Sequence, residues 1–485
     1  MNGTHASTGI AGLDDVLVGG FPRNHLFLVE GHPGTGKTTM ALQFLLAGER
    51  EGEKGLYVTL SESRDEIIEV GTSHGWKLDT IPIFEMTPDV QELSPEEQYT
   101  VFHPSDVELN DTTKLVLQQV EQANPTRVVF DSLSELRLLA RDALRYRRQI
   151  LALKRYFAGR KCTVLLLDDL TGDPNDLQLE SIAHGVIAMQ RLEREYGVNR
   201  RRLEVRKLRG ARFREGYHDF SIEPGGIVVH PRLIAAEHRP ILDHEPLPSG
   251  LPALDQLLGG GIDSGTSTLL MGPAGAGKST IAVHYAISAA ERNDVACFFC
   301  FDESASTLAK RAKGLGTPLD KHMASGKLIV QQVDPAELAP GAFVARIREL
   351  VVERKAKVIV IDSLNGLLNA MPDERFLVIQ LHELLSFLAQ QGVATIMTLA
   401  QQGVIGSGMT TPLDLSYIAD SVVLFRYFES AGKVKQAISV MKKRSGPHER
   451  SIRELSFDGR GIHVGPPLEN FEGVLTGVPR EKKAR

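Results

Sequence analysis

Short apolar runs recur along the chain, and each ends at polar or glycine-containing residues. In the first half these runs are His25–Glu30 (HLFLVE), Gly55–Leu60 (GLYVTL), Arg127–Phe130 (RVVF) and Cys162–Leu167 (CTVLLL). Uninterrupted apolar runs of this length are typical of strands buried on both faces of a parallel sheet. Residues 38–50, TTMALQFLLAGER, have the spacing of an amphipathic helix. The pattern predicts an α/β fold with a mostly parallel central sheet flanked by helices.

The chain contains an internal repeat. Residues 7–38, STGIAGLDDVLVGGFPRNHLFLVEGHPGTGKT, align with residues 248–279, PSGLPALDQLLGGGIDSGTSTLLMGPAGAGKS. Lys37 lies 241 residues before Lys278, whereas Asp131 in RVVFDSLSEL lies 231 residues before Asp362 in VIVIDSLNGL. The first copy is therefore ten residues longer between these points, and we place the extra residues in the polar run Ser94–Asp106. A repeat of this size indicates a duplicated domain rather than a solenoid.

The length of 485 residues suits two domains of ordinary size or three small ones. The segment RLIAAEHRPILDHEPLPSG is polar and rich in proline, which favours a linker there. We therefore divide the chain into a first domain at residues 1–232, a linker at 233–247, a second domain at 248–470 and a short C-terminal tail at 471–485.

Two segments match the phosphate-binding pattern G-x-x-x-x-G-K-[ST]: residues 31–38, GHPGTGKT, and residues 272–279, GPAGAGKS. In such a loop the backbone N–H groups and the lysine hold phosphate oxygens, and the hydroxyl binds Mg²⁺. Each match follows a predicted strand and precedes a predicted helix, so we expect ATP and Mg²⁺ as cofactors. The expected nucleotide contacts are Gly34, Thr35, Gly36, Lys37, Thr38 and Thr39 in the first copy and Gly275, Ala276, Gly277, Lys278, Ser279 and Thr280 in the second.

Acidic residues close the strands next to these loops. Asp131 and Asp362 each end an apolar strand, where an acid can hold Mg²⁺ together with Thr38 or Ser279. The alternative is an aspartate that caps the following turn.

A second set of acids ends the second strand of each copy. Glu62 and the pair Asp302–Glu303 can activate an attacking nucleophile as general bases, with the P-loop lysines Lys37 and Lys278 as catalytic cations, and Asp302 can add a metal ligand. The alternative is a solvated strand end. Ser61 stands where the second copy has Asp302, so the sequence predicts one acid in the first site and two in the second.

These motifs together resemble the KaiC family of RecA/DnaB-type P-loop ATPases. The likeness runs from about Ser7 to Pro479 and includes the lead-ins GLDDVLVGG and ALDQLLGG, DLSYIADSVVLFRYFE and AISVMKKRSGPHERSIRE. It implies two tandem RecA-like domains in a two-tiered homohexamer with ATP at subunit interfaces. It further implies a slow ATPase in the first domain and a serine/threonine autokinase and autophosphatase in the second.

The resemblance also assigns residues of the second domain. The phosphoacceptor pair falls on Ser416 and Tyr417, with tyrosine where the family has threonine, so Ser416 is the expected acceptor. Asp302 would be the kinase base, assisted by Glu303, although it is shorter than the family glutamate. The alternative for Ser416 is an ordinary serine at a helix start.

Further contacts follow from the same resemblance. The segment Lys207, Leu208 and Arg209 would reach the ATP of the neighbouring subunit, as would Lys442 and Arg444 in the second domain. Ser73 matches a nucleotide contact of the first domain, and Leu315 replaces the tryptophan that stacks on adenine. Without the resemblance, the basic residues would be read as a solvated strand face.

Composition bears on the competing functions. A nucleic-acid-dependent ATPase of the RecA/DnaB type would use basic segments such as residues 141–157 or 200–202. The net charge of −6 and the pI near 6.2 argue against nucleic acid as a partner, and acids interrupt the basic segments. A scaffold that binds ATP only to assemble is the third alternative, and the acids argue against it. With three cysteines and neither a signal peptide nor a membrane span, we expect a cytoplasmic protein with protein regulators.

Overall fold

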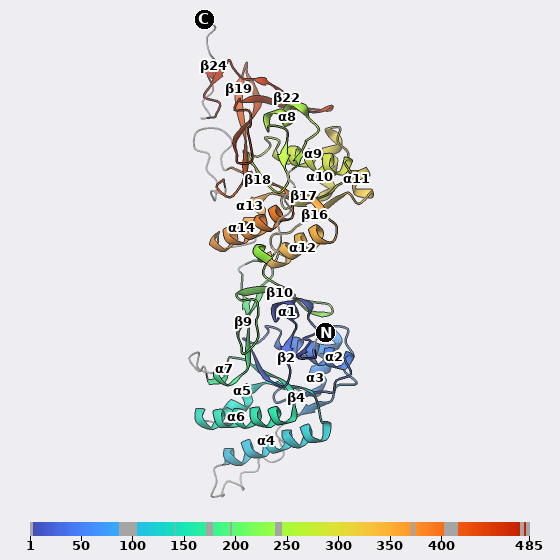
Figure 1. Cartoon of the computed structure of the whole chain (residues 1–485), viewed down its shortest axis with the longest axis vertical. Coiled ribbons are helices and arrows are strands. Elements are labelled where there is room, and N and C mark those ends of the chain that lie inside the picture. Colours follow the sequence, from blue (N-terminus) through green and yellow to red (C-terminus); the bar gives the residue numbers. More distant parts are fainter. Residues whose placement is uncertain are drawn as a thin grey trace. The chain divides into compact units, whose positions relative to one another are not determined.

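The computed structural model describes residues 3–86, 104–140, 142–170, 178–194, 196–237, 245–369, 374–401, 416–475 and 480–481. The chain divides into two compact units, Met1–Arg232 and Leu233–Arg485 (Figure 1). The extra residues expected between Ser94 and Asp106 lie largely outside the described part of the chain.

Nine strands among the described residues of the first unit form one sheet. Their order is β11-β10-β9-β8-β3-β7-β6-β4-β5, parallel from β8 to β5 and antiparallel from β8 to β11. The strands are β3 Leu26–Glu30, β4 Gly55–Thr59, β5 Ile83–Glu85, β6 Arg127–Asp131, β7 Thr163–Asp168, β8 Gly185–Leu192, β9 Arg200–Leu208, β10 Tyr217–Glu223 and β11 Gly226–His230. The small pair β1 His5–Ala6 and β2 Phe21–Pro22 lies outside this sheet.

Helices cover both faces of that sheet (Figure 1). They are α1 Ala11–Val16, α2 Lys37–Arg50, α3 Arg64–Ser73, α4 Pro104–Ala123, α5 Leu133–Ala140, α6 Ala143–Arg160 and α7 Gln178–Ile182. Successive residues of a strand point to opposite faces, so Phe27 joins the core under α2 whereas Leu28 joins the core under α6. This double burial explains why the strands are continuous apolar runs.

The second unit repeats this topology within its described residues. Its sheet has the order β16-β15-β17-β18-β14-β19-β20-β21-β22, and again the strands after β19 are antiparallel. The strands are β14 Ser267–Gly272, β15 Val295–Cys300, β16 Leu328–Gln332, β17 Ala356–Asp362, β18 Ala394–Ala400, β19 Ser421–Ser430, β20 Lys433–Lys443, β21 Arg453–Asp458 and β22 Gly461–Pro467. The two sheets confirm the predicted α/β fold with a mostly parallel sheet in each domain.

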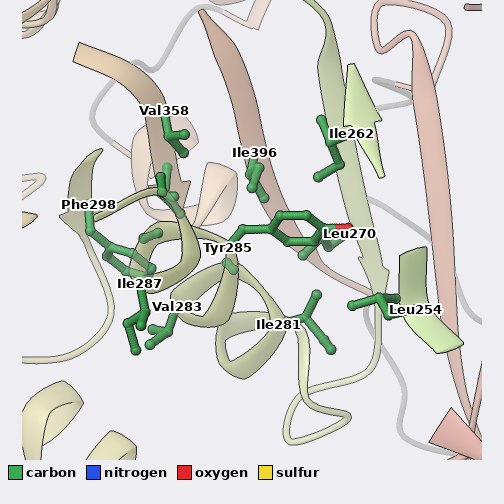
Figure 2. Packing of buried hydrophobic residues seen from close by; sticks show 14 of the residues in the cluster. Leu254, Ile262, Leu270, Ile281, Val283, Tyr285, Ile287, Phe298, Val358 and Ile396 are labelled. Carbon is green, nitrogen blue, oxygen red and sulfur yellow. The ribbon is translucent and has the colours of Figure 1, made fainter. Parts of the chain in front are cut away.

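The helices of the second unit pack in the same way. They are α8 Pro252–Leu257, α9 Lys278–Glu291, α10 Ala305–Gly314, α11 Asp320–Ala324, α12 Pro340–Val352, α13 Leu364–Asn369 and α14 Glu374–Gln390. Figure 2 shows the ring of Tyr285, on α9, lying near Leu270 of β14 and Ile396 of β18. This fully buried ring helps fix α9, and with it the loop that precedes it, against the sheet.

Several short elements lie in the predicted linker and tail. The 3₁₀ helix Ala235–Glu237 and strand β12, Pro246–Leu247, fall within residues 233–247, and Leu233 and Ala235 are buried in the core of the second unit. In the tail, β23 Phe471–Glu472 pairs with β24 Arg480–Glu481. Strand β12 pairs with β13, Ile262–Asp263.

The three cysteines are buried and free. Cys297 and Cys300 lie in separate cores on the two faces of the second sheet, so their two thiols do not converge on one site. Burial raises the pKa of each of these two thiols to about 12, and burial also raises the pKa of Cys162 in the first unit. Among the described residues, no helix is both long enough and apolar enough to cross a membrane.

Candidate nucleotide sites

The first glycine-rich loop connects β3 to α2. Lys37 is the first residue of α2, and its Nζ donates to the backbone oxygens of Gly31 at 2.7 Å and His32 at 3.2 Å. Gly36 has φ +103°, a left-handed conformation that favours glycine, and no side chain caps the helix start. The N–H groups of the first turn are thus left for an anion, which the helix dipole attracts.

The second loop has the same construction between β14 and α9. Lys278 Nζ donates to the oxygens of Gly272 at 2.9 Å and Pro273 at 2.7 Å, and Gly277 has φ +98°. Burial lowers the pKa of Lys278 to about 8, against the opposing effect of the Asp362 and Asp302 charges. A bound phosphate would supply the counter-charge that favours the ammonium form.

Neighbouring side chains enforce glycine at both helix starts. A Cβ on Gly36 would lie 2.8 Å from Ile222 Cδ1, and a Cβ on Gly277 would lie 2.2 Å from Phe457 Cζ. The antiparallel strands β10 and β21 supply these side chains, so the second half of each sheet helps shape the loop.

The predicted metal ligands meet in pairs. Thr38 Oγ1 donates to Asp131 at 2.9 Å, and Ser279 Oγ donates to Asp362 at 3.1 Å. A further hydroxyl, from Tyr57 in the first unit and Thr398 in the second, also donates to each carboxylate. Burial raises the pKa of both aspartates.

This donor set fits Mg²⁺. Mg²⁺ is usually held by one or two protein oxygens together with water and substrate phosphates. A hydroxyl and a carboxylate beside a phosphate-binding loop meet that need, although in the described ranges no group of three or more His, Cys, Asp or Glu side chains is arranged to hold a metal ion by itself.

Glu62 lies just beyond β4 in the first unit and is half-buried. Its Oε2 is buried and has no hydrogen-bond partner among the described residues. Burial, reinforced by the charges of Asp131 and other nearby acids, raises its pKa. An unsatisfied carboxylate oxygen with a raised pKa is suited to accept a hydrogen bond, and then a proton, from water.

The two acids of the second unit have different partners. Ser363 Oγ donates to Asp302, while Glu303 forms an ion pair with Arg311 on α10. Burial raises the pKa of Glu303 although Arg311 opposes it. Asp302 is thus held toward β17, on which Asp362 lies, and Glu303 is held toward α10.

One further acid lies in the first site and was not predicted from the sequence. Asp169, just beyond β7, forms an ion pair with Lys37 at 2.8 Å, and Ser134 Oγ donates to it at 3.1 Å. Glu62 stays the single acid predicted at the end of the second strand, and Asp169 is a further acid beside Lys37. The motif VLLLDD shows two acids after an apolar strand, but only the pairing of β7 with β3 places the end of β7 beside the loop that follows β3.

The residues expected to cross a subunit interface contact their own chain. Lys207 and Arg209 donate to the backbone oxygens of Glu180 and Ser181, the latter at 2.7 Å. Lys442 donates to Ser416 O at 2.9 Å and Ala419 O at 2.7 Å, and Arg444 to Tyr417 O at 2.8 Å. They lie where β8 and β19 begin, whereas the glycine-rich loops follow the ends of β3 and β14. Leu208 is buried in the core.

The remaining candidates lie at the unit surfaces. Ser73, at the end of α3, donates to Val70 O at 2.8 Å, and Leu315 is the C-cap of α10. Ser416 and Tyr417 lie in a turn before β19, not at a helix start, and Tyr417 is exposed.

The basic residues 200–202 have partners within the first unit. Arg200 pairs with Asp219 at 2.9 Å, and the Arg202 guanidinium lies 3.8 Å from the centre of the Tyr217 ring. These contacts account for two of the three arginines without nucleic acid.

The chain is similar to a known family of proteins over most of its length. A family model described as "ATPase: KaiC" matches residues 6–234 and again 247–469. The chain is 26% identical to "Circadian clock protein KaiC3" of Synechocystis sp. (strain ATCC 27184 / PCC 6803 / Kazusa), over 97% of this chain and 94% of that protein. It is 27% identical to "Circadian clock oscillator protein KaiC" of Acaryochloris marina, over 98% and 91%, and of Thermostichus vulcanus, over 97% and 91%. The two matches confirm the resemblance seen in the sequence, and the chain belongs to the KaiC family of ATPases.

Proposed function

We propose that this KaiC-family ATPase hydrolyses Mg-ATP in its first domain and transfers phosphate from ATP to serine in its second. The observation that carries the proposal is the pairing of Thr38 with Asp131 and of Ser279 with Asp362 beside a glycine-rich loop. Both units thus bring the phosphate-binding lysine and the hydroxyl–carboxylate pair to one end of the sheet. Bound Mg²⁺ would neutralise charge on the β- and γ-phosphate oxygens.

In the first domain, Glu62 acts as general base. Its unsatisfied Oε2 orients a water molecule and accepts its proton as the water oxygen bonds to the γ-phosphorus and the bond to ADP breaks. The raised pKa of Glu62 supports this role, because a base with a higher pKa holds the proton better. Lys37 stabilises the charge that develops on the phosphate oxygens.

In the second domain, Asp302 acts as the base toward the Ser416 hydroxyl of an adjacent copy. The serine oxygen bonds to the γ-phosphorus, the bond to ADP breaks, and the serine proton passes to Asp302. The hydrogen bond from Ser363 supports the assignment, because it orients one oxygen of Asp302 and leaves the other available. Glu303, held by Arg311, assists through its charge.

Assembly completes the proposed sites. In a homohexamer, Lys207 and Arg209, or Lys442 and Arg444, would stabilise phosphate charge on the neighbouring subunit, which requires them to leave the backbone oxygens that they now contact. Further protein regulators and a cytoplasmic location complete the proposal, and the free cysteines support a reducing compartment.

The test is to incubate the pure full-length protein with Mg-ATP, follow phosphate release, map phosphosites and measure the assembly by native mass spectrometry. We expect a hexamer, phosphate release that Glu62→Gln lowers at least a hundredfold in the first domain, and Ser416 phosphorylation that Asp302→Asn abolishes. Glu69→Gln is the matched control, since Glu69 is an exposed glutamate on α3. Turnover at the wild-type rate in the triple variant Glu62→Gln, Asp302→Asn, Glu303→Gln would refute the assignment.

The same assay addresses the nucleic-acid alternative. Single-stranded DNA added at low and high salt should leave phosphate release unchanged. Salt-dependent stimulation would favour a nucleic-acid-dependent ATPase instead.

A further inference from the structure

Asp169 occupies a defined place beside the first glycine-rich loop. Strands β3 and β7 are parallel neighbours, with Glu30 opposite Asp168, so the residues after both strands lie side by side. Asp168 turns to Arg137, at 2.8 Å, while Asp169 turns to Lys37, at 2.8 Å. The two successive carboxylates therefore serve different partners, and only Asp169 belongs to the loop.

The ammonium of Lys37 has all of its protons committed. A lysine ammonium has three donors, and those of Lys37 face Gly31 O, His32 O and Asp169 Oδ1. A phosphate oxygen that binds Lys37 must take at least one of these donors. Of the three acceptors only Asp169 is a side chain, so it is the one that can swing aside without distorting the loop.

The second domain lacks this acid at the equivalent position. Leu28 lies opposite Leu166 in the first unit, and its repeat equivalent Leu269 lies opposite Met397 in the second, so Asp169 corresponds to Ala400. Asn365, the equivalent of Ser134, donates from Nδ2 to Ala400 O at 3.1 Å and accepts from the N–H of Ala400 at Oδ1, at 2.7 Å. Where the first unit has the Lys37–Asp169 ion pair, the second unit has the neutral contact between Asn365 and Ala400.

We propose that Asp169 is a positioning residue that competes with nucleotide phosphate for Lys37, and so weakens nucleotide affinity in the first site relative to the second. The inference rests on the proposed function only in that nucleotide binds at Lys37. Ser134 retains the carboxylate near the loop after it leaves Lys37, so the competitor stays at high local concentration and favours nucleotide release.

The charge of Asp169 is maintained near neutral pH. Burial alone would raise its pKa, but the hydrogen bond and charge of Lys37, with hydrogen bonds from Ser132 and Ser134, bring the pKa below its ordinary value. The carboxylate of Asp169 is therefore ionised when a nucleotide phosphate competes with it for Lys37.

The test uses full-length protein in which Lys278→Ala silences the second site, titrated with a fluorescent ADP analogue. Asp169→Asn keeps the shape and removes the charge, and we expect it to tighten the Kd about tenfold through slower release. Asp169→Glu keeps the charge and should stay within about threefold of the parent. In the reciprocal experiment, with Lys37→Ala, the substitution Ala400→Asp should weaken the second site about tenfold.

The outcomes separate this inference from the proposed function. A Kd for Asp169→Asn that is unchanged or weaker than the parent would overturn the competition. So would a fall in kcat with an unchanged KM, because Asp169 would then be a catalytic acid. Loss of all binding in the parent variant would instead count against nucleotide binding at Lys37.

Discussion

Replacing Gly277 with alanine should destabilise the second domain more than replacing Gly36 destabilises the first. Both residues have a left-handed backbone, which costs an alanine about 1–2 kcal/mol. They differ in what the new methyl group meets. At Gly36 it meets the terminal Cδ1 of Ile222 at 2.8 Å, whereas at Gly277 it meets the ring of Phe457 at 2.2 Å.

The two environments set the expected magnitudes. An isoleucine methyl can move by a rotation about one bond, so Gly36→Ala should cost about 1–2 kcal/mol, mostly from the backbone. A phenyl ring moves as a rigid body, so Gly277→Ala should add about 1–3 kcal/mol of overpacking. The expected difference in the free energy of unfolding is therefore about 1–3 kcal/mol.

Urea unfolding can resolve the two domains. Trp76 is the single tryptophan and lies in the first unit, so its fluorescence follows the first domain while circular dichroism follows both. Gly36→Ala should move the fluorescence midpoint, and Gly277→Ala only the remaining part of the dichroism change. Phe457→Leu should recover part of the loss in Gly277→Ala, because it shortens the side chain that clashes. Equal costs at the two glycines, or no recovery with Phe457→Leu, would refute the steric argument.

Three further predictions follow from buried charges. Burial raises the pKa of Glu30 to about 7, so ionisation of Glu30 destabilises the folded state as the pH rises from about 4.5 through 7. The free energy of unfolding of Glu30→Gln, measured by calorimetry, should therefore increase relative to that of the wild type between pH 5 and pH 8, by up to about 3 kcal/mol. Arg127 is fully buried against Glu51 and Glu53, so Arg127→Met should cost about 3 kcal/mol in urea unfolding, and a neutral result would contradict this. Because phosphate binds the protonated form of Lys278, nucleotide affinity at the second site should fall up to tenfold per pH unit above about 8, measured with the first site silenced.

The sequence allowed the prediction of elements whose signal is local. The apolar runs that became β3, β4, β6 and β7 are buried on both faces, so their composition alone indicated parallel strands. The glycine-rich loops were also predictable, because their spacing is dictated by the backbone geometry around a phosphate. Strand order could not be predicted, because it depends on which distant strands become neighbours.

The same limit explains the missed acid. Asp169 follows an apolar strand, as many capping residues do, and its role depends on β7 lying next to β3. The basic residues on β9 and β20 are a second case. The β8–β9 pair has a register shift just before Lys207, and the β19–β20 pair has one just before Lys442. No local sequence pattern predicted either shift. Phosphorylation of Ser416 and contact across subunits stay predictions.

The buried cysteines can report the transient opening of each domain. A thiol reagent attacks the thiolate, which burial suppresses at Cys162, Cys297 and Cys300, so labelling requires a domain to open. One cysteine belongs to the first unit and two belong to the second. The intact mass after a labelling pulse therefore distinguishes the two domains, because opening of the first domain adds one adduct and opening of the second adds two. Adding nucleotide during the pulse would show which half of the duplicated chain it stiffens, without any engineered label.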